Sequence, residues 1–204
     1  MHNRQWKRMA IWAAGLALLS VARPVQAQML VQAIGGMTKT AETKPVFAAA
    51  IGGKAGPVEL GVEGGHFHNI APKSIFDATQ AATGGTVDAD MPAWYGMGNI
   101  KLIAKRGAIQ PFVQAGAGAA RLHPELTAND PRVTLSSQFG VSGDTTKFLA
   151  GAGAGLRVKA QKLILEGGYR YIRIFQEYHP TSNINGGKVM VNVNMFYVSA
   201  GLYF

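Results

Sequence analysis

Three glutamates and three cations stand at alternating positions within glycine-rich, apolar stretches of this chain of 204 residues. They are Glu59, Glu63, Lys101, Arg157, Glu166 and Arg170. Charges in such surroundings have to be paired, because removing a partner leaves an uncompensated buried charge. Equal numbers of each sign predict a network of ion pairs that fills a confined interior. The alternative is a gated conduction path through the same charges.

His66 and His68 are candidate metal ligands, since residues two apart share one face of an extended strand. Two imidazoles can begin a metal site, but the sequence offers no evident third ligand. We therefore expect polar residues at an interface or loop base here, and no metal or other cofactor. The run from Gly151 to Gly155 is not a nucleotide-binding loop, because no Lys-Ser or Lys-Thr follows it and strand periodicity continues on both sides.

Eight stretches with strand periodicity must position these side chains. Each combines period-two alternation with abundant Val, Ile, Tyr and Phe, and each reaches the roughly 10 residues that a tilted membrane strand requires. The predicted strands are Leu30–Lys39, Pro45–Lys54, Val58–Ile70, Ala93–Ile103, Ala108–Leu122, Thr146–Val158, Lys162–Phe175 and Met190–Phe204.

The connections between these strands alternate in length. Residues 55–57, 104–107 and 159–161 form tight turns, whereas residues 71–92, 123–145 and 176–189 form long polar segments, with a shorter one around 40–44. Tight turns at one rim and long loops at the other are typical of an outer-membrane barrel. The pattern predicts an all-β fold, an eight-stranded antiparallel up-and-down transmembrane β-barrel.

The N-terminal residues 1–27 have the organisation of a cleavable secretory signal. Arg4, Lys7 and Arg8 precede an apolar run, and Val25-Gln26-Ala27 offers the small-residue exit that signal peptidase reads. The apolar run is shorter than the roughly 18 residues of a membrane-spanning helix. We predict cleavage after Ala27 and a mature barrel over residues 28–204, with an N-terminal membrane anchor as the alternative.

Composition excludes several other classes of protein. The chain has no cysteine, so it forms no disulfide or thiolate metal site, and charged residues make up only 15% of it. The net charge of +9 falls by four without the leader, and the remaining cations are scattered along the chain. We therefore expect no binding to nucleic acid.

Alternation alone leaves open which face points inward, and glycine helps to decide. The charged face is also the glycine face, and a narrow lumen in which glycine leaves room for long charged side chains explains this. Aromatic residues near the strand ends suit a membrane interface. The predicted girdle contains Phe47, Phe67, Trp94, Tyr95, Phe148 and Tyr171 near the loops, and Tyr203 and Phe204 at the other rim.

The final residues, 196–204, end in Phe204 with apolar residues such as Leu202 at alternate positions behind it. This segment resembles the C-terminal strand of bacterial outer-membrane proteins, which implies recognition by the barrel-assembly machinery. With the eight-strand layout, residues 28–204 resemble the small-barrel superfamily that includes OmpA transmembrane domains and OmpX. Asn192 and Asn194 depart from the pattern, because they take lipid-facing positions. They lie above the bilayer, or a bulge near Met195 shifts the register.

A second resemblance concerns His179-Pro180-Thr181-Ser182-Asn183. It is similar to the His-x-Ser-Asn segment of outer-membrane lipid A deacylases, which would make Ser182 a nucleophile and His179 its base. However, an extra residue separates the two, and no Asp or Glu follows Ser182, although Glu177 is near. A catalytic triad requires that third group, so we expect no enzyme.

The sequence thus predicts a non-enzymatic, porin-like barrel of the bacterial outer membrane that serves the cell envelope or surface interactions through long loops. Its expected partners are outer-membrane lipids, lipopolysaccharide and the barrel-assembly machinery. Two alternatives stay open, a lipid A-modifying hydrolase and a periplasmic ligand-binding barrel of the lipocalin type.

Overall fold

A computed structural model describes residues 28–40, 42–72, 87–104, 107–123, 125–128, 145–178 and 189–204. Every regular element in these residues is a strand. The barrel strands are β1 (Gln28–Lys39), β2 (Thr43–Ala55), β3 (Val58–Phe67), β5 (Ala93–Ile103), β6 (Ile109–Leu122), β8 (Thr145–Ala160), β9 (Leu163–Tyr178) and β10 (Val189–Tyr203). Two short strands, β4 (Val87–Asp90) and β7 (Glu125–Ala128), pair with each other outside the barrel.

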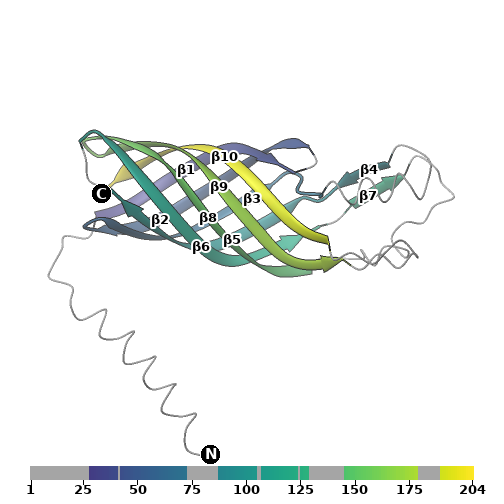
Figure 1. Ribbon diagram of the computed structural model, residues 1–204. Helices are drawn as coiled ribbons and strands as arrows, with labels where there is room; N and C mark the ends of the chain where they lie inside the picture. Colours follow the sequence, from purple (N-terminus) through teal and green to yellow (C-terminus); the bar gives the residue numbers. More distant parts are fainter. Residues whose placement is uncertain are drawn as a thin grey trace, which may run out of the picture.

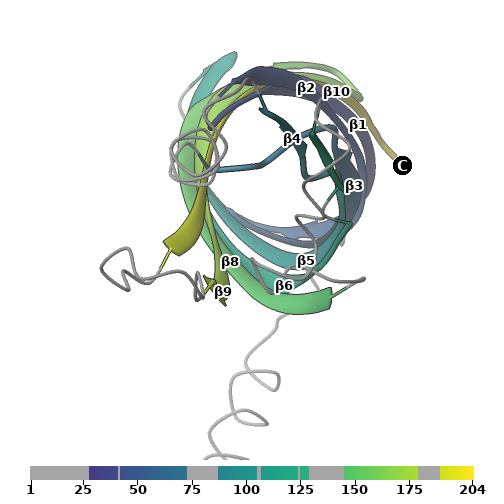
Figure 2. The same ribbon diagram turned by 90° about the vertical axis from the view of Figure 1, so that its right-hand side faces the viewer.

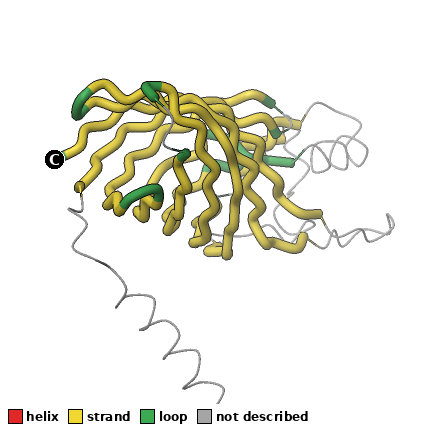
Figure 3. The backbone as a smooth tube through the Cα atoms, turned by 60° about the vertical axis from the view of Figure 1, so that its left-hand side comes forward, coloured by secondary structure: helices red, strands yellow, loops and turns green. Residues whose placement is uncertain are grey.

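The eight long strands of the described residues close into a barrel in the order β1-β10-β9-β8-β6-β5-β3-β2, and every pairing is antiparallel (Figure 1). Seen from the loop end, the strands form one ring (Figure 2). Almost all of the described backbone is strand, with short loops at the ends of the barrel (Figure 3). Closure leaves no strand edge unpaired, which a chain in lipid requires because no water satisfies free backbone groups there.

The predicted eight-stranded barrel is confirmed, and each predicted strand overlaps one barrel strand. Two details differ. The third strand ends at Phe67, before the predicted Ile70, and the long connections contain β4 and β7, which the sequence analysis assigned to loops. Four-residue strands in polar segments carry too little periodicity to be recognised. Among the described residues, no helix is long and apolar enough to cross a membrane.

The apolar rows of the strands face outward. Leu60 and Val62 of β3, Leu156 of β8 and Val198 of β10 are each more than half exposed, whereas the alternate positions are buried inside the barrel. An apolar surface that extends over all strands is unfavourable in water but matches the hydrocarbon of a bilayer. The barrel is therefore inverted relative to a soluble one, as predicted.

The predicted aromatic girdle is only partly correct. Phe47, Trp94, Phe148, Tyr171 and Phe204 are exposed on the outer face. In contrast, Phe67, Tyr95 and Tyr203 are buried inside the barrel, with at most 5% of their surface exposed. These three residues occupy the inward positions of their strands. The alternation along the strand therefore decides whether an aromatic side chain faces the lumen or the lipid, even close to a strand end.

Asn192 and Asn194 take outward positions on β10, as the alternation required. The register with β9 is continuous from Val191 to Leu202, so no bulge occurs near Met195, and the irregularity lies between Val189 and Val191. The Tyr169 hydroxyl donates to Asn194 Oδ1 at 2.5 Å, and the Tyr171 hydroxyl donates to Asn192 Oδ1 at 2.7 Å. These hydrogen bonds satisfy both amide oxygens in the loop-side half of the outer face.

The loop-side half of the lumen is an apolar core. Inward residues near that rim pack together with residues from the connection between β3 and β5. The members from the strands include Val46, Phe67, Leu122, Leu149, Ile172, Ile174, Val191, Val193 and Met195, and those from the connection are Ile70, Ala71 and Met91. Asn69 fixes the connection, because its Oδ1 accepts from the backbone N–H of Ala71 at 2.8 Å and of Met91 at 3.1 Å.

Glycines on the inner face admit aromatic rings. Gly65 lies directly opposite Tyr95 in the register, and a Cβ added there would come within 2.8 Å of the Tyr95 ring. Gly168 has the same relation to Tyr197, with 3.0 Å to the ring. A ring that covers a cross-strand glycine protects a thin part of the sheet. The glycines were expected to leave room for long charged side chains, but at these positions they accommodate tyrosines.

Candidate functional site: the charged lumen

The half of the lumen near the tight turns contains four of the six predicted charges in one cluster. Arg157, which is fully buried, donates from Nε to Glu166 at 2.6 Å and from a terminal nitrogen to Glu59 at 3.0 Å. Lys101 Nζ lies 2.8 Å from Glu166 Oε2 and 3.4 Å from Glu59 Oε1. Each carboxylate therefore contacts two cations. We call Glu59, Lys101, Arg157 and Glu166 the lower cluster.

Tyr203 of the last strand completes the lower cluster. Its hydroxyl accepts from Arg157 at 2.5 Å and donates to Glu59 Oε2 at 3.0 Å. The ammonium groups of Lys159 and Lys54 lie 5.0 and 5.6 Å from the centre of its ring, within the range of cation–π attraction. The strand that carries the predicted assembly signal is thus also tied into the lumen.

The other two charges form an upper cluster nearer the loops. The Arg170 guanidinium donates both terminal nitrogens to Glu63, at 2.6 and 3.0 Å, in the bidentate arrangement that makes such pairs strong. Glu63 also accepts from the Tyr95 hydroxyl at 2.7 Å and from the Asn99 amide at 3.2 Å. The Gln114 side chain joins Arg170 to Tyr197, whose hydroxyl lies 2.8 Å from the Gln114 amide.

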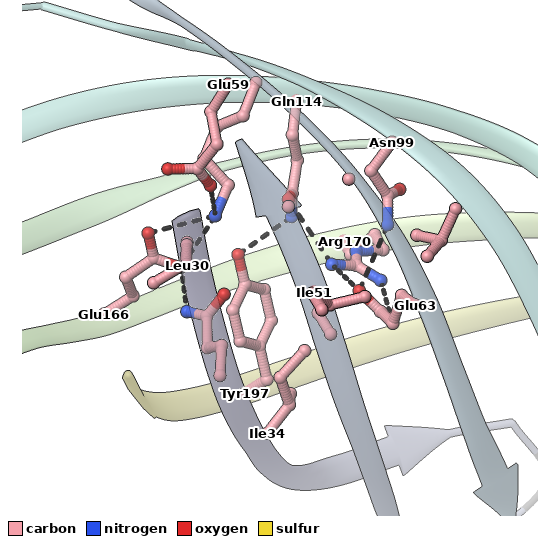
Figure 4. Close-up of a pocket in the computed structure, with 16 residues that line it drawn as sticks. Leu30, Ile34, Ile51, Glu59, Glu63, Asn99, Gln114, Glu166, Arg170 and Tyr197 are labelled. Carbon is pink, nitrogen blue, oxygen red and sulfur yellow. Dashed lines mark hydrogen bonds and ion pairs between the residues drawn. The ribbon is translucent and has the colours of Figure 1, made fainter. Parts of the chain in front are cut away.

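A cavity of about 30 Å³ lies between the two clusters. Glu59, Lys101 and Glu166 of the lower cluster border it, and so do Glu63 and Arg170 of the upper one (Figure 4). This volume suffices for one water molecule, which needs about 10–15 Å³ and several polar partners. The lumen between the two clusters is therefore filled by paired side chains and has no room for an organic ligand.

The register gives the geometry of the main pair. Arg157 of β8 lies directly opposite Glu166 of β9, and Glu59 of β3 lies directly opposite Lys101 of β5. The tight turn holds only Gln161 and Lys162, whereas the sequence analysis placed it at residues 159–161. Gln161 has a φ of 53°, which closes the two-residue turn.

Several polar residues of the network were not identified from the sequence. Gln32 donates to Glu166 at 2.7 Å and to Ser199 at 2.5 Å, while Gln114 and Tyr197 support the upper cluster. Only the alternation of inward and outward positions could have identified them, because each occupies an inward position on its strand. Uncharged residues did not stand out against the rest of the chain.

The remaining predicted site residues that the structure describes do not converge on a reactive centre. His66 and His68 take outward positions near the loop-side rim, and in the described part of the chain no group of His, Cys, Asp or Glu could hold a metal ion. Ser182 and His179 lie outside the described residues, as does the leader, residues 1–27. Leu202 and Phe204 point outward at the turn-side rim, with 47% and 70% of their surface exposed.

A closed antiparallel barrel with an apolar outer face and a filled, charged lumen defines a transmembrane β-barrel of the small outer-membrane type. No family model and no curated protein sequence matches the chain. Solved structures do. Neisserial surface protein A has a TM-score of 0.59 at 12% identity, over 87% of this chain and 97% of that one.

Two further structures have the same fold. The N-terminal β-barrel domain of Pseudomonas aeruginosa OprF has a TM-score of 0.51 at 12% identity, over 88% of this chain and all of that one. Outer membrane protein W of E. coli has a TM-score of 0.52 at 11% identity, over 89% of this chain and all of that one. The predicted resemblance to small outer-membrane barrels is confirmed at the level of the fold, and the predicted outer-membrane location agrees with these neighbours.

Proposed function

We propose that this chain is a non-enzymatic barrel of the outer membrane that stabilises the envelope and presents its long connections outside the cell. The observation that carries the proposal is the filled lumen. The lower cluster lies near the tight turns, the upper cluster lies nearer the loops, and an apolar core fills the loop-side half, with a cavity of only about 30 Å³ between the clusters. Such an interior supports a rigid anchor for loops and does not support a pore.

The topology supports the orientation. Gln28 and Tyr203 are both at the rim of the tight turns, at the end of the barrel where the C-terminus lies (Figure 1). The strand ends that the long connections join, and the β4–β7 sheet, are at the opposite rim (Figure 1). In barrels of this kind, short turns face the periplasm and long loops face outward. Binding or recognition is expected on such loops, because a rigid scaffold positions them.

The filled lumen also argues against the ligand-binding alternative. A lipocalin-type barrel holds its ligand inside, in an apolar cavity, and faces water with polar residues. Here the described lumen is closed by ion pairs, and the outer face is apolar. The hydrolase alternative rests on Ser182 and His179, for which the described residues provide no geometry, so we do not propose it.

A deletion strain tests the proposal. Loss of the protein should weaken the outer-membrane barrier, measured as entry of a large hydrophobic antibiotic or dye, and should leave the acylation of lipid A unchanged in mass spectrometry. Expression of the wild type and of Ser182→Ala should restore the barrier equally. A change in lipid A mass that Ser182→Ala fails to restore would overturn the non-enzymatic proposal in favour of the hydrolase.

A further inference from the structure

The net positive charge of the barrel is concentrated at the rim of the tight turns, where the C-terminus lies (Figure 1). The net charge of +9 falls to +5 outside the predicted leader, because the leader holds four cations and no acid. The tight turns and the strand ends beside them, residues 54–57, 104–107 and 159–162, contain no Asp or Glu. Their cations account for the whole excess, and they are Lys54, Lys105, Arg106, Lys159 and Lys162.

The rest of the chain outside the leader is electrically balanced. The two lumen clusters contain three cations and three carboxylates. The segments around the long connections and the β1–β2 connection, residues 39–44, 73–90, 121–147 and 173–188, contain eight cations and eight acids. Cations that are scattered along the sequence therefore leave an excess of positive charge at one end of the barrel only.

Ion pairing within the barrel cannot neutralise this rim. The carboxylates nearest to it are Glu59 and Glu166, and each already contacts both Arg157 and Lys101. Lys54 lies directly opposite Glu59 in the register, so any pair that it makes there shares a carboxylate with two other cations. Whichever of these pairs forms, the turn-side half keeps more cations than carboxylates. Such a patch of one sign creates a potential that attracts an anionic partner.

Two lysines of this rim face the mouth of the lumen. Lys54 of β2 and Lys159 of β8 take inward positions on either side of β10, and their ammonium groups lie 5.6 and 5.0 Å from the centre of the Tyr203 ring. Lys54 is buried and Lys159 is half-buried, whereas Lys162 in the turn between β8 and β9 is exposed. We call these three lysines, with Tyr203 between them, the basic mouth. The other two cations of the rim lie outside the described residues and are not part of it.

The inward direction of Lys54 and Lys159 decides which kind of partner fits. Phospholipid headgroups surround the outer wall of a barrel, so they reach outward side chains and not those that face the barrel axis. In the proposed orientation the tight turns, and with them the basic mouth, face the periplasm. An anion that approaches from the aqueous periplasm has access to these lysines, which favours a soluble partner over a lipid.

We propose that the basic mouth docks an acidic segment of a periplasmic protein, whose carboxylates meet the ammonium groups of Lys54, Lys159 and Lys162. The three lysines come from two different turns, so a chain with several carboxylates can contact them together. A single small anion gains less, because one exposed ion pair contributes little by itself. Lysine suits such a partner, since its compact charge on a flexible stem adapts to carboxylates at different positions.

This inference rests on the proposed orientation, and it is tested on the purified barrel, so that its failure leaves the envelope phenotype of a deletion strain untouched. The signal-cleaved barrel is reconstituted in phosphatidylcholine nanodiscs, where both rims are open to the solution. Fluorescein-labelled hexaglutamate is the probe, and the anisotropy of its fluorescence measures binding. We expect saturable binding that weakens with added salt, because salt screens exposed charges, and we expect no binding of hexaglutamine.

Lys159→Gln with Lys162→Gln should weaken the binding of hexaglutamate about tenfold, because two of the three ion pairs are lost. Lys39→Gln with Lys44→Gln is the matched control, since it removes the same charge from the opposite rim at β1 and β2, and it should bind like the wild type. Thermal unfolding without peptide verifies that each variant is folded. If the turn-side double variant does not fold, Lys162→Gln alone provides the comparison at an exposed position.

Four results would overturn the proposal. They are no binding of hexaglutamate, equal affinity of the turn-side variant and the wild type, an equal loss of affinity in the loop-side control, and equal binding of hexaglutamine. A competition experiment separates the lipid alternative. If dihexanoyl phosphatidylglycerol displaces the labelled peptide as well as unlabelled hexaglutamate does, the rim binds anionic lipid and the proposal is wrong.

Discussion

Arg157 of β8 and Glu166 of β9 occupy directly opposite positions of the barrel wall, and Nε of Arg157 lies 2.6 Å from Oε1 of Glu166. The pair is sealed from solvent on all sides, since Arg157 is fully buried and Glu166 is 4% exposed. Lys101 and Glu59 reach the same point from β5 and β3 across the lumen. Strands far apart in the barrel order are therefore joined through one arginine–glutamate pair.

Removal of one charge from this pair should destabilise the barrel strongly. Glu166→Gln leaves Arg157 and Lys101 short of a carboxylate, and a broken buried pair costs about 3–5 kcal/mol. In a double-mutant cycle with Arg157→Gln, the two changes should be coupled by roughly 0.5–3 kcal/mol. Urea unfolding of the barrel in lipid bilayers measures both values.

The exposed pair of Glu42 and Lys44 serves as the control for this cycle. Its two charges lie 2.9 Å apart, but their side chains are 46% and 35% exposed. Solvent screening should reduce its coupling to about 0–1 kcal/mol. If the coupling energy between Glu166 and Arg157 is no larger than that of this surface pair, the proposed ion-pair network does not stabilise the barrel. The barrel fold would not be affected by that result.

Two glycines on opposite faces should respond differently to alanine. At Gly65, which faces inward, an added Cβ would come within 2.6 Å of the Phe47 carbonyl oxygen and 2.8 Å of the Tyr95 ring. Gly65→Ala should therefore cost about 1–3 kcal/mol through overpacking. Gly96→Ala, on the open outer face, should be neutral or stabilise by up to about 1 kcal/mol. Equal unfolding free energies for the two variants would show that the inner face is not closely packed.

An arginine at Ala152 tests which face meets the lipid. Ala152 lies outward at the middle of β8, where arginine costs roughly 2–4 kcal/mol in a bilayer. Ala152→Leu at the same position should cost little, because it keeps the surface apolar. If Ala152→Arg and Ala152→Leu unfold at the same urea concentration in bilayers, the outward assignment is wrong.

Gly153, the inward neighbour of Ala152, is no suitable comparison for that test. A Cβ added there would collide with the Tyr169 carbonyl oxygen and would come within 3.0 Å of the Arg170 Cα. Any side chain at Gly153 is therefore costly for steric reasons. The sequence analysis expected inward glycines to leave room for long charged side chains, but the alternation of residue types carries no information about the space between strands.

The sequence was sufficient for the architecture because a transmembrane barrel repeats one simple rule. Each strand alternates apolar and small or charged residues, and the turns differ in length between the two rims, so strand number, order and inward face all follow. The same rule placed Glu59, Lys101, Arg157 and Glu166 on the inner face. Aromatic residues were harder to assign, because Tyr95 and Tyr203 fit an interface girdle by position and the lumen by parity.

What the sequence did not reveal depends on contacts between distant strands. The lower and upper clusters separate because Arg170 turns to Glu63 across the barrel, a choice that depends on the shear of the closed sheet. Likewise, Gln32 and Ser199 donate hydrogen bonds to Glu166 only because β1 and β10 pair to close the barrel. Neither strand marks these residues by charge or by motif.

The terminal phenylalanine should matter for assembly in the cell more than for stability. Phe204 is 70% exposed at the turn-side rim, and its backbone N–H donates to the Met29 carbonyl at 2.9 Å, a bond that any residue except proline can make. Phe204→Asp should therefore lower the outer-membrane yield several-fold while refolding into detergent micelles stays close to wild type. Normal yield in the membrane would remove the assembly signal, and failed refolding would point to a structural role.

The central claim, that the barrel is a closed anchor with a filled lumen, is tested most directly by the electrical conductance of the purified protein in planar bilayers. Insertion is verified beforehand by heat-modifiable migration of the reconstituted protein on a gel. The account predicts no steady unitary current at moderate voltage, because paired charges and an apolar core occupy the lumen in series. Stable unitary currents whose ion selectivity changes in Lys101→Gln would contradict it and would assign the same charges to a conduction path.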